Sequence, residues 1–292
     1  MIDVCLITTC MGRLSHLKAT LPRMIAQPGC RVVVVDYSCP DRCGDWVESK
    51  CPEATVVRIE DEIEFNPSRA RNAGAQAAKT EWLFFLDADI ILDRSFSETV
   101  FADIRKGSFH VSEISLKNKA FNTLICSLED FERVRGYDEI YRGWGDEDVD
   151  LVESLQWAGV TLKTFPTALI EHIPHEGAAY HAHDRRFSFI TNRAFRTIKF
   201  DIMKLQGRFL PFDMRKAIYQ GVQSMVKTAC EDPGRADLQL EIGQSRVRLL
   251  SGNTVEEKPV PVEWKITKSL VYSLSAMMPG PATTGAMYNP DA

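Results

Sequence analysis

Apolar runs alternate with helically spaced segments over the first hundred residues. Residues 2–9, 31–36 and 82–86 are rich in aliphatic, β-branched or aromatic side chains, as in strands buried on both faces of a parallel sheet. Between the first two runs, apolar residues from 14 to 25 recur at helical spacing before Pro28-Gly29. The order strand, helix, strand predicts a right-handed βαβ unit.

The following residues continue this alternation. A helix that starts near Pro67 is rich in alanine and directly precedes the run 82–86. The acids from 146 to 150 lead into a helix that we expect to end at Gly159. Further predictions are helices at 41–50 and 96–105 and strands at 54–59, 109–115, 121–127, 160–165 and 168–170.

The character of the chain changes beyond residue 184. Residues 185–216 hold nine Lys or Arg against two acids, interleaved with phenylalanines. This predicts a basic amphipathic helix that either contacts an anionic surface, such as a membrane or phosphorylated substrate, or packs on the domain with its charges in water. Farther on, 238–242 and 245–250 predict a hairpin around Gly243-Gln244, and the last dozen residues predict a disordered tail.

Composition narrows the class of protein. The chain has 292 residues, with 45% hydrophobic and 26% charged residues, which is typical of a folded globular protein. Its net charge of −5 gives no reason to expect nucleic acid as a partner. Asp3 interrupts the first apolar run, and no apolar stretch approaches 18 residues, so we expect neither a signal peptide nor a membrane span and favour the cytoplasm.

Eight cysteines are spread over the chain, three of them close together at Cys39, Cys43 and Cys51. The chain has no C-x-x-C pair, which zinc sites often use. We therefore expect free, reduced thiols rather than a metal site, while a disulfide among the three clustered cysteines stays open.

Two carboxylates follow the most apolar run directly, at Asp87 and Asp89. Ligands of open α/β sheets bind beyond the carboxyl ends of the strands, where these acids lie. Side chains two residues apart on an extended segment point the same way, so both carboxylates can face one cation. Oxygen ligands of this kind suit Mg²⁺ or Mn²⁺ bound together with substrate phosphates, although the same pair also suits a polar turn.

Two further segments carry candidate chemistry. Arg69 and Arg71 lie near the start of the alanine-rich helix, where positive charge is unfavourable unless an anion compensates it, and we expect a phosphate contact. The block 143–150 places several acids at a helix start, and their mutual repulsion should raise at least one pKa. His172 or His175 could then be a metal ligand, a core residue or a surface residue.

Taken in order, these segments resemble the GT-A glycosyltransferases, in particular the family-2-like group that includes chondroitin-type polymerases. The chain is also similar to β-1,4-galactosyltransferases and polypeptide GalNAc-transferases. The resemblance covers residues 2–176 and rests on Ala70-Arg71-Asn72-x-Gly74, on Asp87-x-Asp89, and on Gly143-Trp144-Gly145-x-Glu147-Asp148. In the family the last block reads Gly-Trp-Gly-Gly-Glu-Asp, so Asp146 departs from it.

The resemblance implies a fold and a domain plan. The fold is α/β, a GT-A (Rossmann-like), mixed and mainly parallel sheet flanked by helices, with a helical C-terminal extension. Residues 1–183 would form the catalytic domain, divided into a nucleotide-sugar-binding half at 1–95 and an acceptor-binding half at 96–183. Residues 184–292 would form the basic, helical extension with a partly disordered tail.

The resemblance also implies roles for individual residues. The implied metal ligands are Asp89 and His172. Because His172 follows Trp144 by 28 residues, a spacing similar to that of the family histidine, we prefer it to His175. Asp148 matches the catalytic base and Glu147 an acceptor-binding carboxylate. Residues that match substrate-binding or nucleotide-binding positions, with Asp36 reaching the base and Trp144 lining the sugar, are Thr8, Thr9, Arg13, Asp36, Arg71, Asp87, Trp144 and Gly145.

The implied activity is that of an inverting hexosyltransferase dependent on Mn²⁺ or Mg²⁺. It would move galactose, GalNAc or GlcNAc from a UDP-sugar to a saccharide, lipid-linked or protein acceptor, as in polysaccharide biosynthesis, with peripheral membrane contact through 185–216 left open. A metal ion would neutralise the leaving diphosphate and a carboxylate would accept the proton of the attacking hydroxyl.

Three other classes of protein share part of this pattern. A nicotinamide dehydrogenase requires G-x-G-x-x-G after the first strand, and residues 8–13 offer only Gly12. A sugar-phosphate nucleotidyltransferase should carry a glycine-rich basic loop there, which is absent. A non-catalytic nucleotide-sugar-binding or scaffold protein with the same fold stays open, although the retained acids argue against it.

Overall fold

The computed structural model describes residues 3–118, 123–174, 185–231, 237–250 and 261–273. The chain divides into two compact units, Met1–Arg196 and Thr197–Ala292. The expected metal-ligand alternative, His175, and the last residues of the tail lie outside the described residues.

A seven-stranded mixed sheet forms the centre of the first unit, in the order β3-β2-β1-β4-β7-β6-β8. Neighbouring strands run parallel except at β7, which is antiparallel to both β4 and β6. This confirms the predicted mixed, mainly parallel sheet. The strands are β1 (Val4–Cys10), β2 (Cys30–Tyr37), β3 (Thr55–Ile59), β4 (Trp82–Leu86), β6 (Ser108–Ser112), β7 (Thr123–Ser127) and β8 (Thr161–Phe165).

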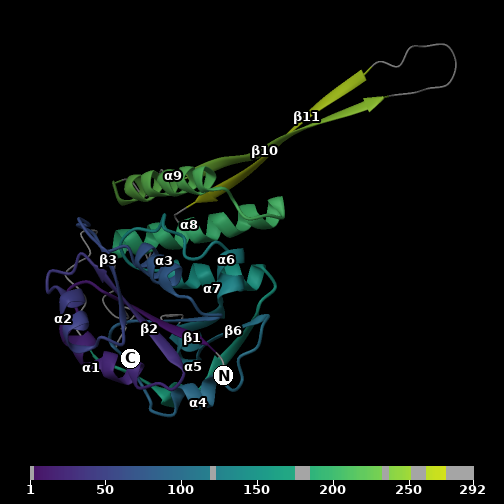
Figure 1. Cartoon of the computed structure of the whole chain (residues 1–292). Helices are drawn as coiled ribbons and strands as arrows, with labels where there is room; N and C mark the ends of the chain where they lie inside the picture. The colour runs from purple at the N-terminus through teal and green to yellow at the C-terminus, as the bar shows by residue number, and fades with distance from the viewer. Residues whose placement is uncertain (1–2, 119–122, 175–184, 232–236, 251–260, 274–292) are drawn as a thin grey trace. The chain divides into compact units, whose positions relative to one another are not determined.

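Helices cover both faces of this sheet (Figure 1). They are α1 (Leu14–Ile25), α2 (Cys43–Lys50), α3 (Pro67–Ala77), α4 (Phe96–Val100), α5 (Glu113–Asn118), α6 (Leu128–Arg133) and α7 (Glu147–Trp157). The predicted helix at 96–105 ends early, at Val100. After it the Arg105 guanidinium donates to the carbonyls of Ala102 and Ile104, both at 2.7 Å, which replaces helical hydrogen bonds there.

Alternate residues of the central strands supply two separate cores. Leu6 and Phe84 belong to the core shared with α1, α2 and α4. Their neighbours Ile7 and Phe85 point to the opposite face, where Phe85 packs on Phe131 of α6 with ring centroids 5.1 Å apart. Burial on both faces explains why these strands read as continuous apolar runs.

A short ribbon lies outside the main sheet. It pairs β5 (Ile90–Leu92) with β9 (Ile170–His172) in antiparallel register, so that Ile90 is opposite His172. A one-turn helix, η1 (Thr167–Leu169), directly precedes β9. The ribbon therefore brings residues 170–172 beside the segment that follows β4.

The C-terminal part of the chain begins with helices, as predicted. Helix α8 (Arg185–Gln206) begins in the first unit and continues in the second, and α9 (Phe212–Glu231) follows after Gly207, whose φ is +67°. None of the described helices combines the length and apolar character that a bilayer crossing requires.

The expected hairpin around Gly243-Gln244 is wrong. Those residues lie inside one strand, β10 (Asp237–Leu250), which pairs with β11 (Pro261–Ser273). The register shifts between Glu241 and Gly243, so the glycine marks a bulge rather than a turn. An isolated glycine within a strand pattern can mark either a turn or a bulge, and the sequence alone does not distinguish these two structures.

Candidate active site

Arg71 joins two acidic segments that are far apart in the sequence. Its Nη2 donates to Asp87 Oδ1 and its Nη1 donates to Glu147 Oε1, both at 3.0 Å. The guanidinium carbon lies 5.1 Å from the ring centroid of Tyr137, a cation–π contact. The end of β4 and the start of α7 therefore meet at one buried arginine.

Helix α3 holds Arg71 at this point. Asn66 caps its start, because the Asn66 side chain accepts the amide of Arg69 at 3.0 Å. Gly74 lets the helix approach the sheet, since a Cβ at that position would lie 2.4 Å from Cγ2 of Ile7. Asn72 exchanges two hydrogen bonds of 2.9 Å with the backbone of Tyr137 and so ties the helix to the acidic segment.

The two arginines of α3 have protein partners. Arg71 is buried against carboxylates, while Arg69 is half exposed and pairs with Glu62. The unfavourable charge near the helix start is thus compensated within the chain. The expected phosphate contact of these arginines stays a prediction.

Asp89 and His172 are brought together by the β5–β9 ribbon. His172 Nε2 lies 3.4 Å from Asp89 Oδ2, and the amide of Ile173 donates to the Asp89 carbonyl at 2.9 Å. The hydrogen bond with Asp89 raises the pKa of His172, although partial burial opposes this. Asp87 lies on the Arg71 side, and burial raises the pKa of its carboxyl while Arg71 lowers it.

This arrangement fits a hard divalent cation. Two ligands of one octahedral ion at about 2.1 Å lie about 3 Å apart, close to the separation of the Asp89 and His172 atoms. Carboxylate and imidazole are both ligands that Mn²⁺ accepts. Among the described residues, Asp89 and His172 offer two ligands here, which leaves the other coordination positions for oxygen atoms of a bound molecule or of water.

The start of α7 carries the remaining acids. Glu147 is buried against Arg71, whereas Asp148 is partly exposed and its Oδ1 accepts the amide of Val149 at 2.7 Å. Asp150 accepts the hydroxyl of Tyr141 at 3.0 Å and is buried. Of these acids, Asp148 has the more open side chain for an incoming substrate.

Asp146 occupies the position at which the similar motif has glycine. Its φ is +71°, a conformation that glycine adopts freely and most other residues do not. Its Oδ1 lies 3.4 Å from Nε of Arg196 on α8, so an ion pair holds the residue in place. The pKa of Asp146 is raised, as expected for one of these acids, but burial is the main cause and repulsion from Glu147 is secondary.

The loop with Trp144 is held by α8. Asn192, fully buried, donates to the carbonyls of Arg142, Trp144 and Gly145 at 2.9 to 3.2 Å. Ser188 Oγ accepts the amide of Trp144 at 3.2 Å. Sequence reasoning missed this supporting role, because nothing in the pattern of α8 distinguishes a buried asparagine from a polar surface residue.

Trp144 also belongs to a stack of aromatic rings and arginines. The guanidinium of Arg185 lies 4.2 Å from the centroid of the Trp144 ring. The ring of Phe189 is 5.5 Å from Trp144, and Arg193 lies 4.7 Å from the Phe189 ring. The indole therefore borders a positively charged surface.

The residues expected near the nucleotide lie at the carboxyl ends of β1 and β2. Thr8 and Thr9 are buried, and Thr8 Oγ1 has no hydrogen-bond partner within the described part of the chain. Asp36 accepts the amides of Cys39 at 3.0 Å and Gly44 at 2.9 Å, so its carboxylate orders the loop before α2. Arg13 is partly exposed at the start of α1.

Comparison with known sequences agrees with this architecture. Residues 5–120 match "Glycosyl transferase family 2", and residues 110–176 match "N-terminal domain of galactosyltransferase". The two matches overlap at residues 110–120 and together include all the residues of the candidate site described above except those of α8.

Curated relatives give weaker but concordant support. The pre-mycofactocin glycosyltransferases of two Mycobacterium tuberculosis strains are 25% identical to this chain over an aligned length of 181, and the match covers 49% of this chain. The chain spans 37% of the length of these relatives.

Similar solved structures share the fold. The mannosyltransferase PcManGT of Pyrobaculum calidifontis, in complex with GDP-Man and Mn²⁺, has a TM-score of 0.52 at 15% identity over 79% of this chain and 75% of that one. Residues 1–349 of S. aureus TarS, in complex with UDP-GlcNAc, have a TM-score of 0.58 at 13% identity over 76% of this chain and 72% of that one.

Proposed function

We propose that this chain, which carries a family 2 glycosyltransferase domain of the GT-A fold, transfers a hexosyl group from a nucleoside-diphosphate sugar to a hydroxyl of a saccharide or glycoconjugate. We further propose that the reaction depends on a divalent cation and inverts the anomeric centre. UDP-activated galactose, GalNAc or GlcNAc are the preferred donors.

The bridge made by Arg71 carries this proposal. It fixes Asp87, next to the proposed metal ligand Asp89, against Glu147, next to the proposed base Asp148. The proposed donor and acceptor sites would thereby share Arg71 as one buried support. Residues 1–95 would supply the donor half and 96–183 the acceptor half.

Asp89 and His172 would hold the cation, which would neutralise the charge that develops on the leaving diphosphate. Arg71 holds the carboxylates in place, because its two hydrogen bonds fix the positions of Asp87 and Glu147. Trp144 would line the acceptor sugar, since aromatic rings pack well on the apolar faces of sugars.

The transfer step would use Asp148 as general base. The acceptor oxygen forms a bond to the anomeric carbon from the face opposite the diphosphate, and the bond from that carbon to the diphosphate oxygen breaks. The electron pair leaves with the nucleoside diphosphate, and the hydroxyl proton passes to the Asp148 carboxylate. Attack from the opposite face accounts for inversion.

A screen of nucleotide sugars tests the donor site. Purified protein is mixed with UDP- and GDP-sugars, with and without Mn²⁺, and thermal unfolding and donor hydrolysis are measured. We expect metal-dependent stabilisation by one nucleotide class, lost in Asp89→Asn and kept in Glu98→Gln, an exposed acid on α4.

The two remaining outcomes decide between alternatives. Stabilisation by a nucleotide sugar without transfer to any acceptor would favour a binding or scaffold protein. The absence of a response to every nucleotide, with and without metal, would contradict the proposal.

A further inference from the structure

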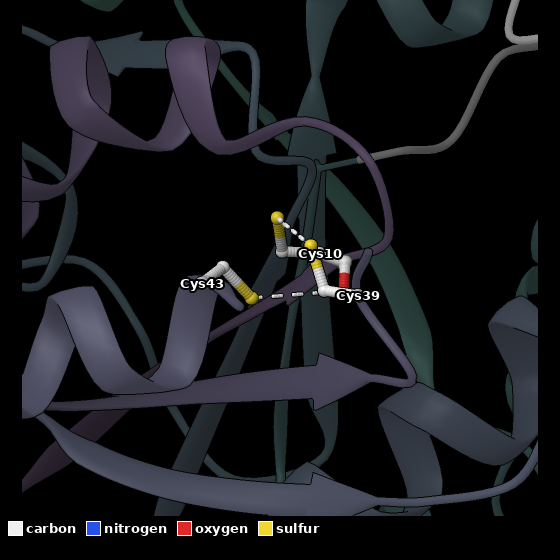
Figure 2. Close-up of side chains that lie close together, drawn as sticks. All are labelled: Cys10, Cys39 and Cys43. Carbon is white, nitrogen blue, oxygen red and sulfur yellow. Dashed lines mark hydrogen bonds between the residues drawn. The ribbon is translucent and has the colours of Figure 1, made fainter. Parts of the chain in front are cut away.

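Three cysteine sulfurs converge near the end of β1 (Figure 2). Cys10 ends β1, Cys39 lies in the loop after β2, and Cys43 opens α2. Their Sγ atoms all lie within 4.8 Å of one another, and all three residues are buried. None of the described cysteines forms a disulfide.

We propose that Cys10, Cys39 and Cys43 bind a thiophilic metal ion, Cu⁺ or Zn²⁺. This site is distinct from the cation site proposed at Asp89 and His172. A zinc–sulfur bond of about 2.3 Å places the sulfurs of one tetrahedral site about 3.8 Å apart. The Cys10 and Cys39 sulfurs are 4.0 Å apart, so little movement brings them to one ion.

The loop that carries two of these sulfurs is ordered in advance. Asp36 accepts the amides of Cys39 and Gly44, on either side of the loop, and the amide of Arg42 donates to the Cys39 carbonyl at 2.9 Å. Cys39 and Cys43 are separated by three residues, a spacing that lies within the range of natural zinc ligands. The site therefore exists before an ion binds.

Two simpler explanations, core packing and a disulfide, account for the three cysteines less well than a metal ion does. Buried cysteines also act as small apolar core residues, and a core gains nothing from bringing three sulfurs from three segments together. A disulfide between Cys10 and Cys39 would need their sulfurs to close from 4.0 Å to about 2.05 Å. Soft sulfur ligands in a buried, three-membered group match Cu⁺ directly, and Zn²⁺ would take water as a fourth ligand.

A metal ion at this site would affect the turn between β1 and α1, which leads to Arg13, one of the residues expected near the nucleotide. The amide of Gly12 donates to the Cys39 sulfur at 3.2 Å, and the next residue is Arg13 at the start of α1. An ion on Cys39 would therefore fix the turn between β1 and α1. Binding to three thiols releases up to three protons, so affinity for the ion should rise with pH.

Metal titration of the whole chain tests this inference. Reduced, metal-free protein is titrated anaerobically with Zn²⁺ or with Cu⁺, and separately with Cd²⁺, whose thiolate charge-transfer absorption counts sulfur ligands. We expect one ion per chain, with the Cd²⁺ band reduced by about one third and affinity lowered by about 100-fold in Cys39→Ala.

Matched variants separate the site from its surroundings. Cys51→Ala removes a buried cysteine that ends the same helix but lies outside the group, and it should bind as the parent protein does. Asp89→Asn should also keep the Cd²⁺ band, so failure of the donor proposal leaves this test intact. Cys39 is the most exposed of the three, so Cys39→Ala perturbs the core least, and its unfolding curve checks the fold.

Three results would overturn the inference. In the first, the protein retains no metal after desalting. In the second, Cys39→Ala leaves the Cd²⁺ band unchanged. In the third, mass spectrometry finds a Cys10–Cys39 disulfide in protein purified without reductant. A preference between Cu⁺ and Zn²⁺ identifies which of the two ions the site takes.

Discussion

Nη1 of Arg71 lies 3.0 Å from Oε1 of Glu147, although the two residues are 76 positions apart in the chain. Both side chains are almost fully buried, and Arg71 reaches Asp87 at the same distance. Removal of one member of a buried ion pair leaves the other charge without compensation, which is more costly than the loss of the pair itself.

Arg71→Lys should therefore destabilise the protein strongly. A lysine ammonium cannot donate to both carboxylates in the same geometry, and we expect a loss of about 3 kcal/mol in the free energy of unfolding. Arg69→Lys is the matched control, because the Arg69–Glu62 pair is exposed and should change stability by less than about 1 kcal/mol. Urea unfolding of both variants measures the difference, and equal losses would contradict the role of Arg71.

Asp148→Asn should separate catalysis from donor binding. If Asp148 is the general base, transfer to the acceptor should fall by about 10²- to 10⁴-fold, because the amide cannot accept the hydroxyl proton. Binding of the donor should stay nearly unchanged, since the proposed metal ligands lie on other segments. Calorimetry of donor binding and release of nucleotide diphosphate give the two quantities, and a parallel loss of both would argue against a base.

Position 146 offers a test of backbone conformation. Asp146→Ala and Asp146→Gly both remove the carboxylate that pairs with Arg196, but alanine is strained at a φ of +71° and glycine is not. The alanine variant should therefore be less stable than the glycine variant by about 1 kcal/mol. Thermal or chemical unfolding can rank the two, and the reverse order would show that the loop adopts another conformation.

Stability should decrease in acid because of His110. Burial lowers the pKa of this β6 histidine to about 4, with a smaller contribution from Lys163. The unfolded histidine titrates near about 6.5, so the neutral folded form stabilises the protein fully above that pH. This stabilisation is lost as the pH falls from about 6.5 toward 4, by up to about 3 kcal/mol at about 1.4 kcal/mol per pKa unit.

His110→Gln should flatten that part of the pH profile. The relevant quantity is the difference in unfolding free energy between variant and parent at each pH, because other groups titrate in the same range. A constant difference between pH 4 and 7 would mean that His110 keeps an ordinary pKa.

The sequence predicted the central part of the fold closely. Runs such as 82–86 are buried on both faces, and five consecutive apolar residues followed by two acids are typical of a strand inside a covered sheet. The buried-strand signal is local in the sequence, so it does not depend on knowing which segments meet in space. The motif around Arg71 was recognised through its resemblance to a family, because the contacts that explain Asn72 and Gly74 are made with Tyr137 and Ile7, which are distant in the sequence.

Features that depend on contacts between distant segments could not be predicted from the sequence. The strand Ile90–Leu92 is too short to show a period, and it forms only because residues 170–172 lie beside it. The buried role of Asn192 requires knowing that its helix faces three carbonyls. Likewise, Cys10 lies 29 residues from Cys39, and no spacing rule connects them.

The close approach of Gly74 to Ile7 has an evolutionary consequence. Because a Cβ at residue 74 would lie 2.4 Å from Ile7 Cγ2, residue 74 cannot gain a side chain while Ile7 keeps its size and position. A lineage that acquires alanine at 74 should first, or soon afterwards, acquire a smaller residue at 7, such as valine or alanine. The two positions should therefore covary among descendants of this sequence, and Ile7→Ala should partly rescue Gly74→Ala in the laboratory.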